Sequence, residues 1–417
     1  DLSNNLGKAD AGVNVTRWKW RYSAGAPIYT TPAIADDGTI VFGTSDGGSG
    51  SLYALSPNGS ESWRPVELGP VQSSPAVGPG TPASALVYVA TAAPTGSKMH
   101  AVRLSDGSDA GVCASGTGAP FLAGLALVET IADNGPLESA VGISGTNRLY
   151  TLRPRAQTPT DSACIEAFVT IQQSVTETIA GDASGLFVGA VDNTTRSFTF
   201  DETSRNWVKN PSWPGGTTVV GGGEVGPLAV LGSDLLATAR PDGLYKIAKG
   251  TGVVTKLGPD GGVSSDPSGP VATPSRIFFT DTDPGSASLW TFDSAALSSS
   301  QTTISGPARS VPLAGAGGLL YVASNAGSLE ARSSDRRVWA VSLAPEGISA
   351  SVTLDCSRAP RSAAGNPSGI LYSATTAGSL FAIVVDSPGL DSTAPWPKYQ
   401  HDVRNTGNPS TPIQSCP

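Results

Sequence analysis

The sequence of 417 residues has little of what most metal, nucleic-acid and membrane sites require. It contains two histidines, four cysteines without a Cys-x-x-Cys pair, and one methionine, which argues against a zinc site. It has no run of Lys and Arg, and its net charge of −8 would repel a phosphate backbone. No apolar run approaches the ~18 residues that span a bilayer. We therefore expect no nucleic-acid partner and no membrane-spanning segment.

Glycine and proline are abundant instead. The chain has 50 Gly and 33 Pro, only 14% charged residues, and 39% apolar residues spread evenly along it. This composition is typical of many short strands joined by tight turns around a folded core.

A short phrase built on Leu and an aromatic residue returns along the chain. Its clearest copies are "SLYAL" (51–55), "RLYTL" (148–152), "GLYKI" (243–247), "SLWTF" (288–292) and "SLFAI" (379–383). Eight copies align, at Leu52, Met99, Leu149, Ser197, Leu244, Leu289, Leu329 and Leu380, with intervals of 40 to 51 residues. A β-rich run such as "GTIVFGT" (38–44) precedes each copy.

Four short strands per unit and a period of 40–50 residues are typical of a β-propeller. One blade cannot bury both faces of its own sheet, so neighbouring blades must bury them mutually. Leu52 and Tyr53 should point to opposite faces and pack against different neighbours. The sequence therefore predicts an all-β fold, an eight-bladed β-propeller of four-stranded antiparallel blades.

The two ends of the chain predict how the ring closes. Seven units carry their own outer strand, but the unit at Leu380 runs directly into "DSPGLDSTAPWP". Near the N-terminus, "TRWKWRY" (16–22) stands alone, and we expect it to supply the outermost strand of blade eight. Residues 1–15 would then be an extension, 16–385 the propeller, and 386–417 a C-terminal tail packed over its outside.

The four cysteines suggest two disulfides. Cys356 lies between blades seven and eight and Cys416 is next to last, so a bridge between them would hold the tail. Cys113 and Cys164 occupy matching positions in blades two and three, although sequence alone allows three pairings. Two disulfides favour an exported protein, in the periplasm, at the cell surface or beyond. A removed signal peptide or an excised fragment would both explain a first residue that is Asp rather than Met.

These units resemble the PQQ-like (quinoprotein alcohol dehydrogenase-like) propeller repeat of secreted bacterial proteins. The residues that carry the resemblance are "TPAIADDGTIVFGTSDG" (31–47), "GSLYALSPNGSESW" (50–63), "SSPAVG" (73–78), "RWKWRY" (17–22) and "PWPKYQHDVRNTGN" (395–408). The resemblance implies the propeller fold but several functions: quinone-dependent dehydrogenases, outer-membrane assembly lipoproteins and surface proteins. The family's enzymes hold pyrroloquinoline quinone above calcium and carry two adjacent bonded cysteines, which this chain lacks.

Candidate site residues are few. Asp281 and Asp283 in "TDTDPGS" (280–286) could begin a calcium loop, but no Glu follows at a useful distance, so we favour a polar turn. We expect no catalytic residue and no cofactor, with calcium as the alternative. The "GGGEVG" segment (221–226) is interpreted as the loop into blade five, and Trp213 in "NPSWPGG" (210–216) as an exposed contact.

The sequence thus predicts a non-catalytic scaffold that binds another protein or a surface polymer. The alternatives are a quinone-dependent dehydrogenase or other propeller enzyme, and an outer-membrane assembly factor. A catalytic propeller needs convergent ionisable groups near its axis, and inner-strand runs such as "PAIA" (32–35) carry almost none. The partner, the binding face and the oligomeric state do not follow from the sequence.

Overall fold

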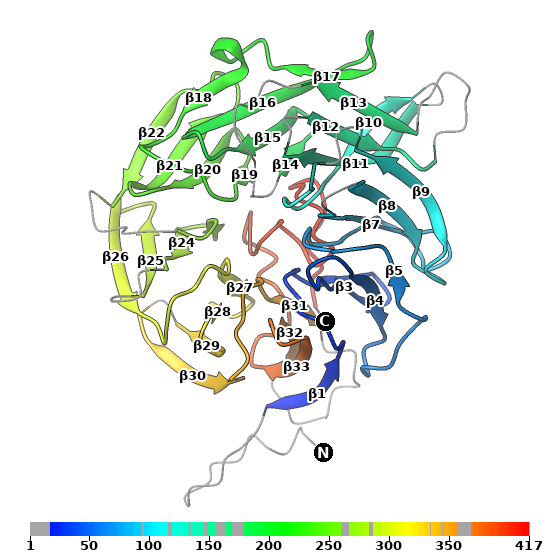
Figure 1. Ribbon diagram of the computed structural model, residues 1–417. Coiled ribbons are helices and arrows are strands. Elements are labelled where there is room, and N and C mark those ends of the chain that lie inside the picture. The colour runs from blue at the N-terminus through cyan, green and yellow to red at the C-terminus, as the bar shows by residue number, and fades with distance from the viewer. Residues whose placement is uncertain are drawn as a thin grey trace, which may run out of the picture.

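The structure is a computed structural model of the chain. It describes residues 17–93, 96–115, 119–132, 135–145, 148–155, 163–168, 179–259, 267–282, 287–333, 335–343, 345–356 and 368–416. These residues form eight antiparallel sheets arranged around an axis (Figure 1). Within them the one labelled helix is a single 3₁₀ turn, η2 (Pro214–Gly216). The predicted eight-bladed propeller of four-stranded blades is confirmed.

Each blade runs from an inner strand near the axis to an outer strand on the circumference. The first four blades are β2 (Ala33–Ile34), β3 (Ile40–Gly43), β4 (Ser51–Leu55), β5 (Val66–Glu67); β6 (Ala76–Val77), β7 (Leu86–Ala90), β8 (Lys98–Arg103), β9 (Asp109–Ala114); β10 (Ala126–Ala132), β11 (Gly135–Ser144), β12 (Arg148–Leu152), β13 (Cys164–Phe168); and β14 (Ile179–Asp182), β15 (Gly185–Gly189), β16 (Thr194–Asp201), β17 (Asn206–Lys209), where β18 (Thr217–Val219) also pairs with β16.

The remaining four blades repeat this order. They are β19 (Ala229–Leu231), β20 (Asp234–Ala239), β21 (Gly243–Ala248), β22 (Val254–Gly258); β23 (Val271–Ala272), β24 (Arg276–Thr280), β25 (Ser288–Asp293), β26 (Ser298–Thr303); β27 (Leu313–Gly315), β28 (Leu319–Ala323), β29 (Ser328–Arg332), β30 (Arg337–Ser342); and β31 (Thr353–Cys356), β32 (Gly369–Ala374), β33 (Ser379–Val385) with β1 (Trp18–Ser23) outermost.

The recurring phrase packs in two directions, as its alternation predicts. Leu52 is fully buried in a cluster shared with blade two, which includes Val87. Its neighbour Tyr53 packs on the cluster shared with blade eight, which includes Tyr372. Adjacent side chains of one strand therefore join their blade to both neighbours.

Strand β1 closes the ring, as predicted. It pairs antiparallel with β33, with Trp18 opposite Ile383 and Tyr22 opposite Leu380. Trp20 then reaches blade one, where its Nε1 donates to the carbonyl oxygen of Pro57 at 3.0 Å. The N-terminal strand is thus both the outer strand of blade eight and a contact with blade one, while residues 1–15, the predicted extension, lie outside the described residues.

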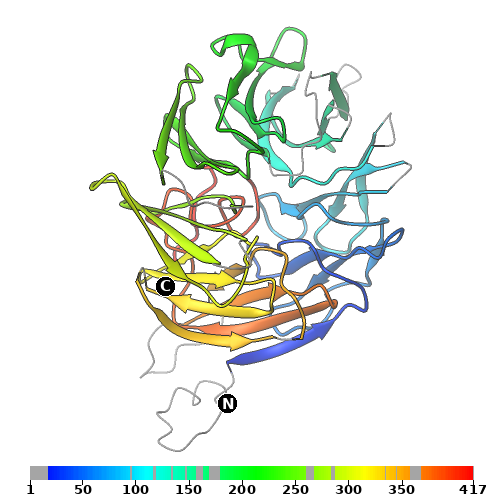
Figure 2. The same ribbon diagram turned by 60° about the vertical axis from the view of Figure 1, so that its left-hand side comes forward.

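The expectation that the C-terminal tail covers the outside of the propeller is wrong. The tail, residues 386–416, turns inward after β33 and passes through the centre of the ring, where it appears red in two views 60° apart (Figures 1 and 2). Six inner strands or their flanks donate a backbone N–H to a tail carbonyl: Ala272 to Trp396, Ala314 to Pro397, Ile34 to Val403, Val77 to Arg404, Leu127 to Thr406 and Gly181 to Gly407, at 2.7 to 2.9 Å.

The inner strands explain this course. Three of them, β2, β6 and β23, are two residues long, and each has a free edge toward the axis. A buried backbone N–H without an acceptor is costly. The tail supplies the acceptors, and so it contacts blades six, seven, one, two, three and four in turn.

Candidate functional site

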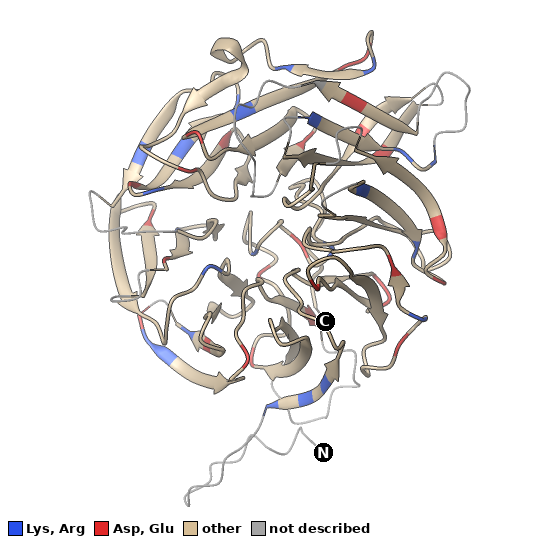
Figure 3. Cartoon of the chain, viewed as in Figure 1, with Lys and Arg blue, Asp and Glu red and all other residues tan. Residues whose placement is uncertain are grey.

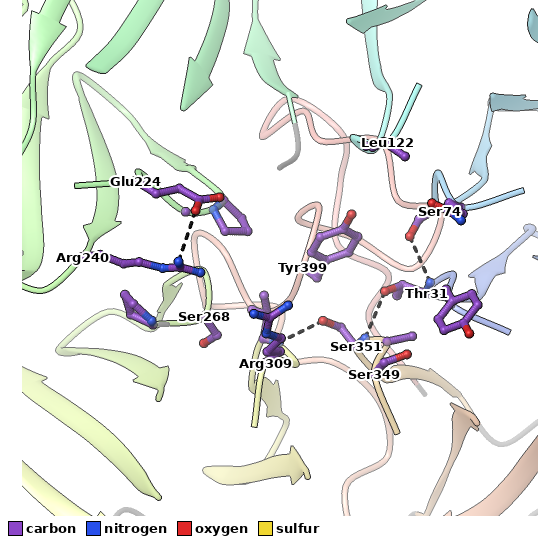
Figure 4. A pocket seen from close by; sticks show the side chains of 17 residues that line it. Thr31, Ser74, Leu122, Glu224, Arg240, Ser268, Arg309, Ser349, Ser351 and Tyr399 are labelled. Atoms are coloured by element: carbon purple, nitrogen blue, oxygen red, sulfur yellow. Dashed lines mark hydrogen bonds and ion pairs between the residues drawn. The ribbon is translucent and has the colours of Figure 1, made fainter. Parts of the chain in front are cut away.

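A funnel opens at one end of the propeller axis. It has a volume of about 440 Å³ and is lined by the axial loops, which we define as the loops that precede the inner strands. Seven blades contribute, through Thr31, Ser74, Leu122, Glu224, Ser268, Arg309 and Ser351 among others, and Tyr399 of the tail lies at the centre of the view (Figure 4).

A chain of hydroxyl bonds ties the axial loops together. The backbone N–H of Val311 donates to Ser351 Oγ at 2.9 Å, that of Ser351 to Thr31 Oγ1 at 3.2 Å, and that of Thr31 to Ser74 Oγ at 2.9 Å. These bonds, dashed in Figure 4, connect blades seven, eight, one and two. Hydroxyl groups of three axial loops therefore fix these four blades relative to one another.

Two further joints continue this chain. Thr238 Oγ1 of blade five donates to the carbonyl of Ser268 at 2.8 Å. Thr280 Oγ1 of blade six lies 3.0 Å from the carbonyls of Ala308 and Ser310 in the loop of blade seven. Five consecutive joints between blades are thus hydrogen-bonded at the funnel, which makes its wall rigid.

The charged groups of the funnel sit on the loops. Arg240 Nη1 lies 3.4 Å from Glu224 Oε2, an ion pair on one wall, and the exposed Arg309 lies near the centre of the view (Figure 4). Two guanidinium groups against one carboxylate give the described lining a net positive charge. The protein as a whole is acidic, with a net charge of −8, so the positively charged funnel is suited to an anionic or strongly polar group.

The floor of the funnel is built from the tail. Gln400 Nε2 donates to the carbonyl of Leu125 at 2.6 Å. A Cβ at Gly124 would lie 2.6 Å from Gln400 Nε2 and 2.9 Å from the Tyr399 hydroxyl. A glycine at this position is therefore needed for the tail to approach blade three so closely.

Next to Tyr399 and Gln400, buried polar side chains of the tail bond to one another and to tail carbonyls. Lys398 is fully buried, and its Nζ donates to the carbonyls of Tyr399 and Asp402 at 2.6 and 2.9 Å and to Asn405 Oδ1 at 2.5 Å. Burial lowers the pKa of Lys398 to about 7, and the nearby Asp402 acts in the opposite direction. Asp402 in turn accepts from Thr406 Oγ1. These bonds hold the tail in one conformation.

A second hollow of about 730 Å³ lies between blades three and four. It is lined by the ends of inner strands β10 and β14 and by the later part of the tail, so it lies at the other end of the axis. Glu129 and Glu202 are exposed in it, Glu138 is partly buried, and Phe200 and Trp207 provide an aromatic wall. Burial raises the pKa of Glu138, which accepts from the Tyr88 hydroxyl at 3.0 Å.

The structure joins the cysteines in the expected pairs. Cys113 is bonded to Cys164, between blades two and three, and Cys356 to Cys416 near the end of the tail. Each bridge therefore joins two segments that are adjacent in the fold but 51 or 60 residues apart in the sequence.

The interpretation of Trp213 as an exposed contact is wrong. Its side chain is 2% exposed, and its Nε1 donates to the carbonyl of Lys249 at 2.6 Å. The loop between β17 and β18 places the Trp213 indole against blade five. There Gly252, with φ +73°, has no side chain and leaves the space that the indole occupies. Trp213 is a packing residue between blades four and five.

The two aspartates do not form a described site. Asp281 is buried and accepts a bond from Trp290 Nε1 at 3.3 Å, while Asp283 lies outside the described residues. Within the described ranges, no three His, Cys, Asp or Glu side chains are grouped so that they could hold a metal ion. Over the same residues, no helix has the length and apolar character that a membrane crossing requires.

The funnel charges were not identified from the sequence. The inner strands carry almost no charge, whereas Glu224 and Arg309 lie in the loops that lead into them and Arg240 lies in the loop between β20 and β21. A signal is present for two of them: Glu224 falls inside "GGGEVG", expected to lead into blade five, and Arg309 directly precedes the Ser of its axial loop.

No protein family and no curated protein matches this sequence. Solved structures share its fold at low identity. BamB from Moraxella catarrhalis is 13% identical with a TM-score of 0.60, over 87% of this chain and 95% of that one. The computationally designed Ika8 protein is 13% identical with a TM-score of 0.57, over 87% and 98%. Saccharomyces cerevisiae Sqt1 is 10% identical with a TM-score of 0.61, over 89% and 99%. The chain is similar to these proteins in fold.

Proposed function

We propose that this protein is an exported, non-catalytic propeller that binds another protein or a surface polymer through its funnel. The observation that carries the proposal is the rigid funnel wall, in which backbone N–H groups of three successive blades bond to hydroxyls of the next. A wall that does not have to reorganise can bind a partner at little entropic cost. Loops on a rigid scaffold are the usual place for such recognition.

The chemistry of the funnel suits a polar, anionic group of the partner. Hydroxyls from Thr31, Ser74 and Ser351 line it, and a hydroxyl that accepts one bond can still donate another. Arg309 and Arg240 line the funnel, and a guanidinium group is well suited to the recognition of a carboxylate or a similar anion. An Asp- or Glu-containing loop, or an acidic polymer, fits these groups.

The two disulfides support the exported location. Disulfides persist in oxidising compartments and are rare in the cytosol, and both bridges join neighbouring parts of the fold. Together with the PQQ-like repeat pattern, they favour a secreted member of that repeat family. The tail supports the non-catalytic part of the proposal because it fills the axis with its own backbone and side chains.

Site-specific photo-crosslinking tests the proposal. Tyr29 lines the funnel and is 43% exposed, whereas Val253, which directly precedes the outer strand β22, does not line it and is 62% exposed. A photoreactive residue at position 29, but not at 253, should crosslink one defined partner from the exported fraction of the source cells. Arg309→Glu should abolish the crosslink. Equal crosslinking at both positions, or saturable binding of pyrroloquinoline quinone with calcium, would overturn the proposal.

A further inference from the structure

The outer strand of each blade has a free edge on the circumference, where unpaired backbone groups can join another strand. Most of these edges carry a feature that discourages such pairing. Strand β5 is only two residues long. A disulfide is attached to β9 and to β13, and β9, β22 and β30 each have a register shift against the adjacent strand. Charged residues stand on most of the others: Glu166 on β13, Lys209 on β17, Lys256 on β22, Arg337 on β30, and Lys19 with Arg21 on β1.

Among the outer strands of the described structure, β26 has none of these features. Its sequence is Ser-Ser-Ser-Gln-Thr-Thr, without charge, Gly, Pro or Cys. It pairs with β25 over six residues without a register shift, from Asp293 opposite Ser298 to Ser288 opposite Thr303. The arc of the ring at β26 is accordingly free of charged residues in Figure 3.

The edge is also accessible. Five of the six residues of β26 are exposed, and the strand lies on the circumference in Figure 1. Leu297, which immediately precedes it, is 74% exposed, the largest value among the large apolar side chains described. A long, regular, uncharged edge beside an exposed leucine has the properties of a strand-pairing site.

We propose that β26 pairs with β26 of a second copy of this chain, antiparallel about a twofold axis. In the register that overlaps the whole strand, Ser298 faces Thr303, Ser299 faces Thr302 and Ser300 faces Gln301 of the other copy. Every such pair is neutral and polar, so the edge is complementary to itself, as a twofold interface requires. At β1 or β30 the same operation would bring Lys or Arg side chains close together.

Sedimentation equilibrium over a concentration series tests this pairing. A contact made by one strand per copy buries little area, so the association should be weak. The average mass should rise from 42.1 kDa toward twice that value as the concentration increases. The variant Ser300→Lys/Gln301→Lys places like charges opposite each other twice, and should weaken dimerisation about tenfold or more.

Two controls make the result specific. Thr255→Lys creates an adjacent lysine pair with Lys256 on β22, an exposed outer strand of blade five, and should leave dimerisation unchanged. A mixture of the double-lysine variant with Ser300→Glu/Gln301→Glu should restore dimers by opposite charge. A wild-type protein that remains at 42.1 kDa at every concentration, or a dimer that the double-lysine variant does not weaken, would overturn the proposal, and neither result bears on the funnel.

Discussion

Asn405 donates its side-chain amide to the backbone carbonyl of Thr31 at 3.0 Å, across 374 positions of the chain. The same Nδ2 donates to the carbonyl of Pro75 at 3.0 Å. Thr31 and Pro75 lie in the axial loops of blades one and two, so one tail residue bridges two blades. The relationship summarises the structure: the ring closes through β1, and the tail then connects its blades from within.

Asn405→Ala should destabilise the protein by about 3 kcal/mol, because it leaves two buried carbonyls and one donor bond of Lys398 without a partner. Asn408→Ala is the matched control. Asn408 Nδ2 makes one bond, to Leu127 O at 3.0 Å, at a partly buried site, and its Oδ1 accepts an exposed bond from the Ser410 N–H. Because no fully buried group loses its partner, the substitution should cost about 1 kcal/mol. Chemical denaturation of both variants measures the difference, and equal losses would contradict the bridging role of Asn405.

Lys398→Met should remove a pH dependence of stability. The pKa of Lys398 is lowered to about 7 in the folded protein, against an ordinary value of about 10.4 when unfolded. Between these values the unfolded state binds the extra proton, so wild-type stability should rise with pH from about 7 upward. Below about pH 7 both states are protonated and this slope should vanish.

The quantity to compare is the free energy of unfolding of the Lys398→Met variant minus that of the wild type, measured from pH 6 to 9.5. Several tyrosines with raised pKa values, such as Tyr88, destabilise the folded state only at higher pH, because they lose their proton more readily when unfolded. Free energies of unfolding in urea should diverge with pH in favour of the wild type. Parallel pH profiles would show that Lys398 does not titrate in this window.

The ring could be predicted from the sequence, and its physical basis explains why. Blade packing repeats eight times, so each Leu and aromatic position of the phrase around Leu52 supports the same conclusion. Closure by "TRWKWRY" (16–22) followed because the last unit lacked an outer strand. A repeated constraint leaves a periodic pattern that a single sequence displays.

The tail and the funnel occur once, and no repeat reveals them. Lys398, Gln400 and Asp402 look like surface residues, and only the six inner-strand N–H groups that the tail satisfies explain why they are buried. Trp213 was misplaced for the same reason, since its contact with Lys249 depends on how blades four and five meet. Unique contacts between distant segments leave no local signal.

Removing the Cys356–Cys416 bridge by serine substitution should lower stability by roughly 2–4 kcal/mol in the chain-entropy account of its loop. The loop spans 60 residues and contains the tail. Hydrogen exchange should increase in residues 389–408 of this variant. Serine substitution of Cys113 and Cys164, a 51-residue loop, is the control, and it should leave exchange in the tail unchanged.

Gly59→Ala should disturb the junction between blades eight and one. Gly59 has φ +87°, and a Cβ there would lie 2.9 Å from the Trp20 ring. Gly25→Ala is the control, with φ +74° and open space around the new Cβ. Both variants carry the strain of a left-handed residue, so the Gly59 variant should be about 1 kcal/mol less stable than the control, with altered Trp20 fluorescence. Equal stabilities would contradict the close contact.

The most direct test of the central claim, that the tail occupies the axis, is residue-resolved hydrogen exchange at Ile34, Val77, Leu127 and Gly181. Their N–H groups donate to carbonyls of residues 403–407 at 2.7 to 2.9 Å. We predict slow exchange at all four in the full chain and fast exchange in a variant truncated after residue 395, with β3 and β7 protected in both. Fast exchange at these four amides in the full chain would contradict the account.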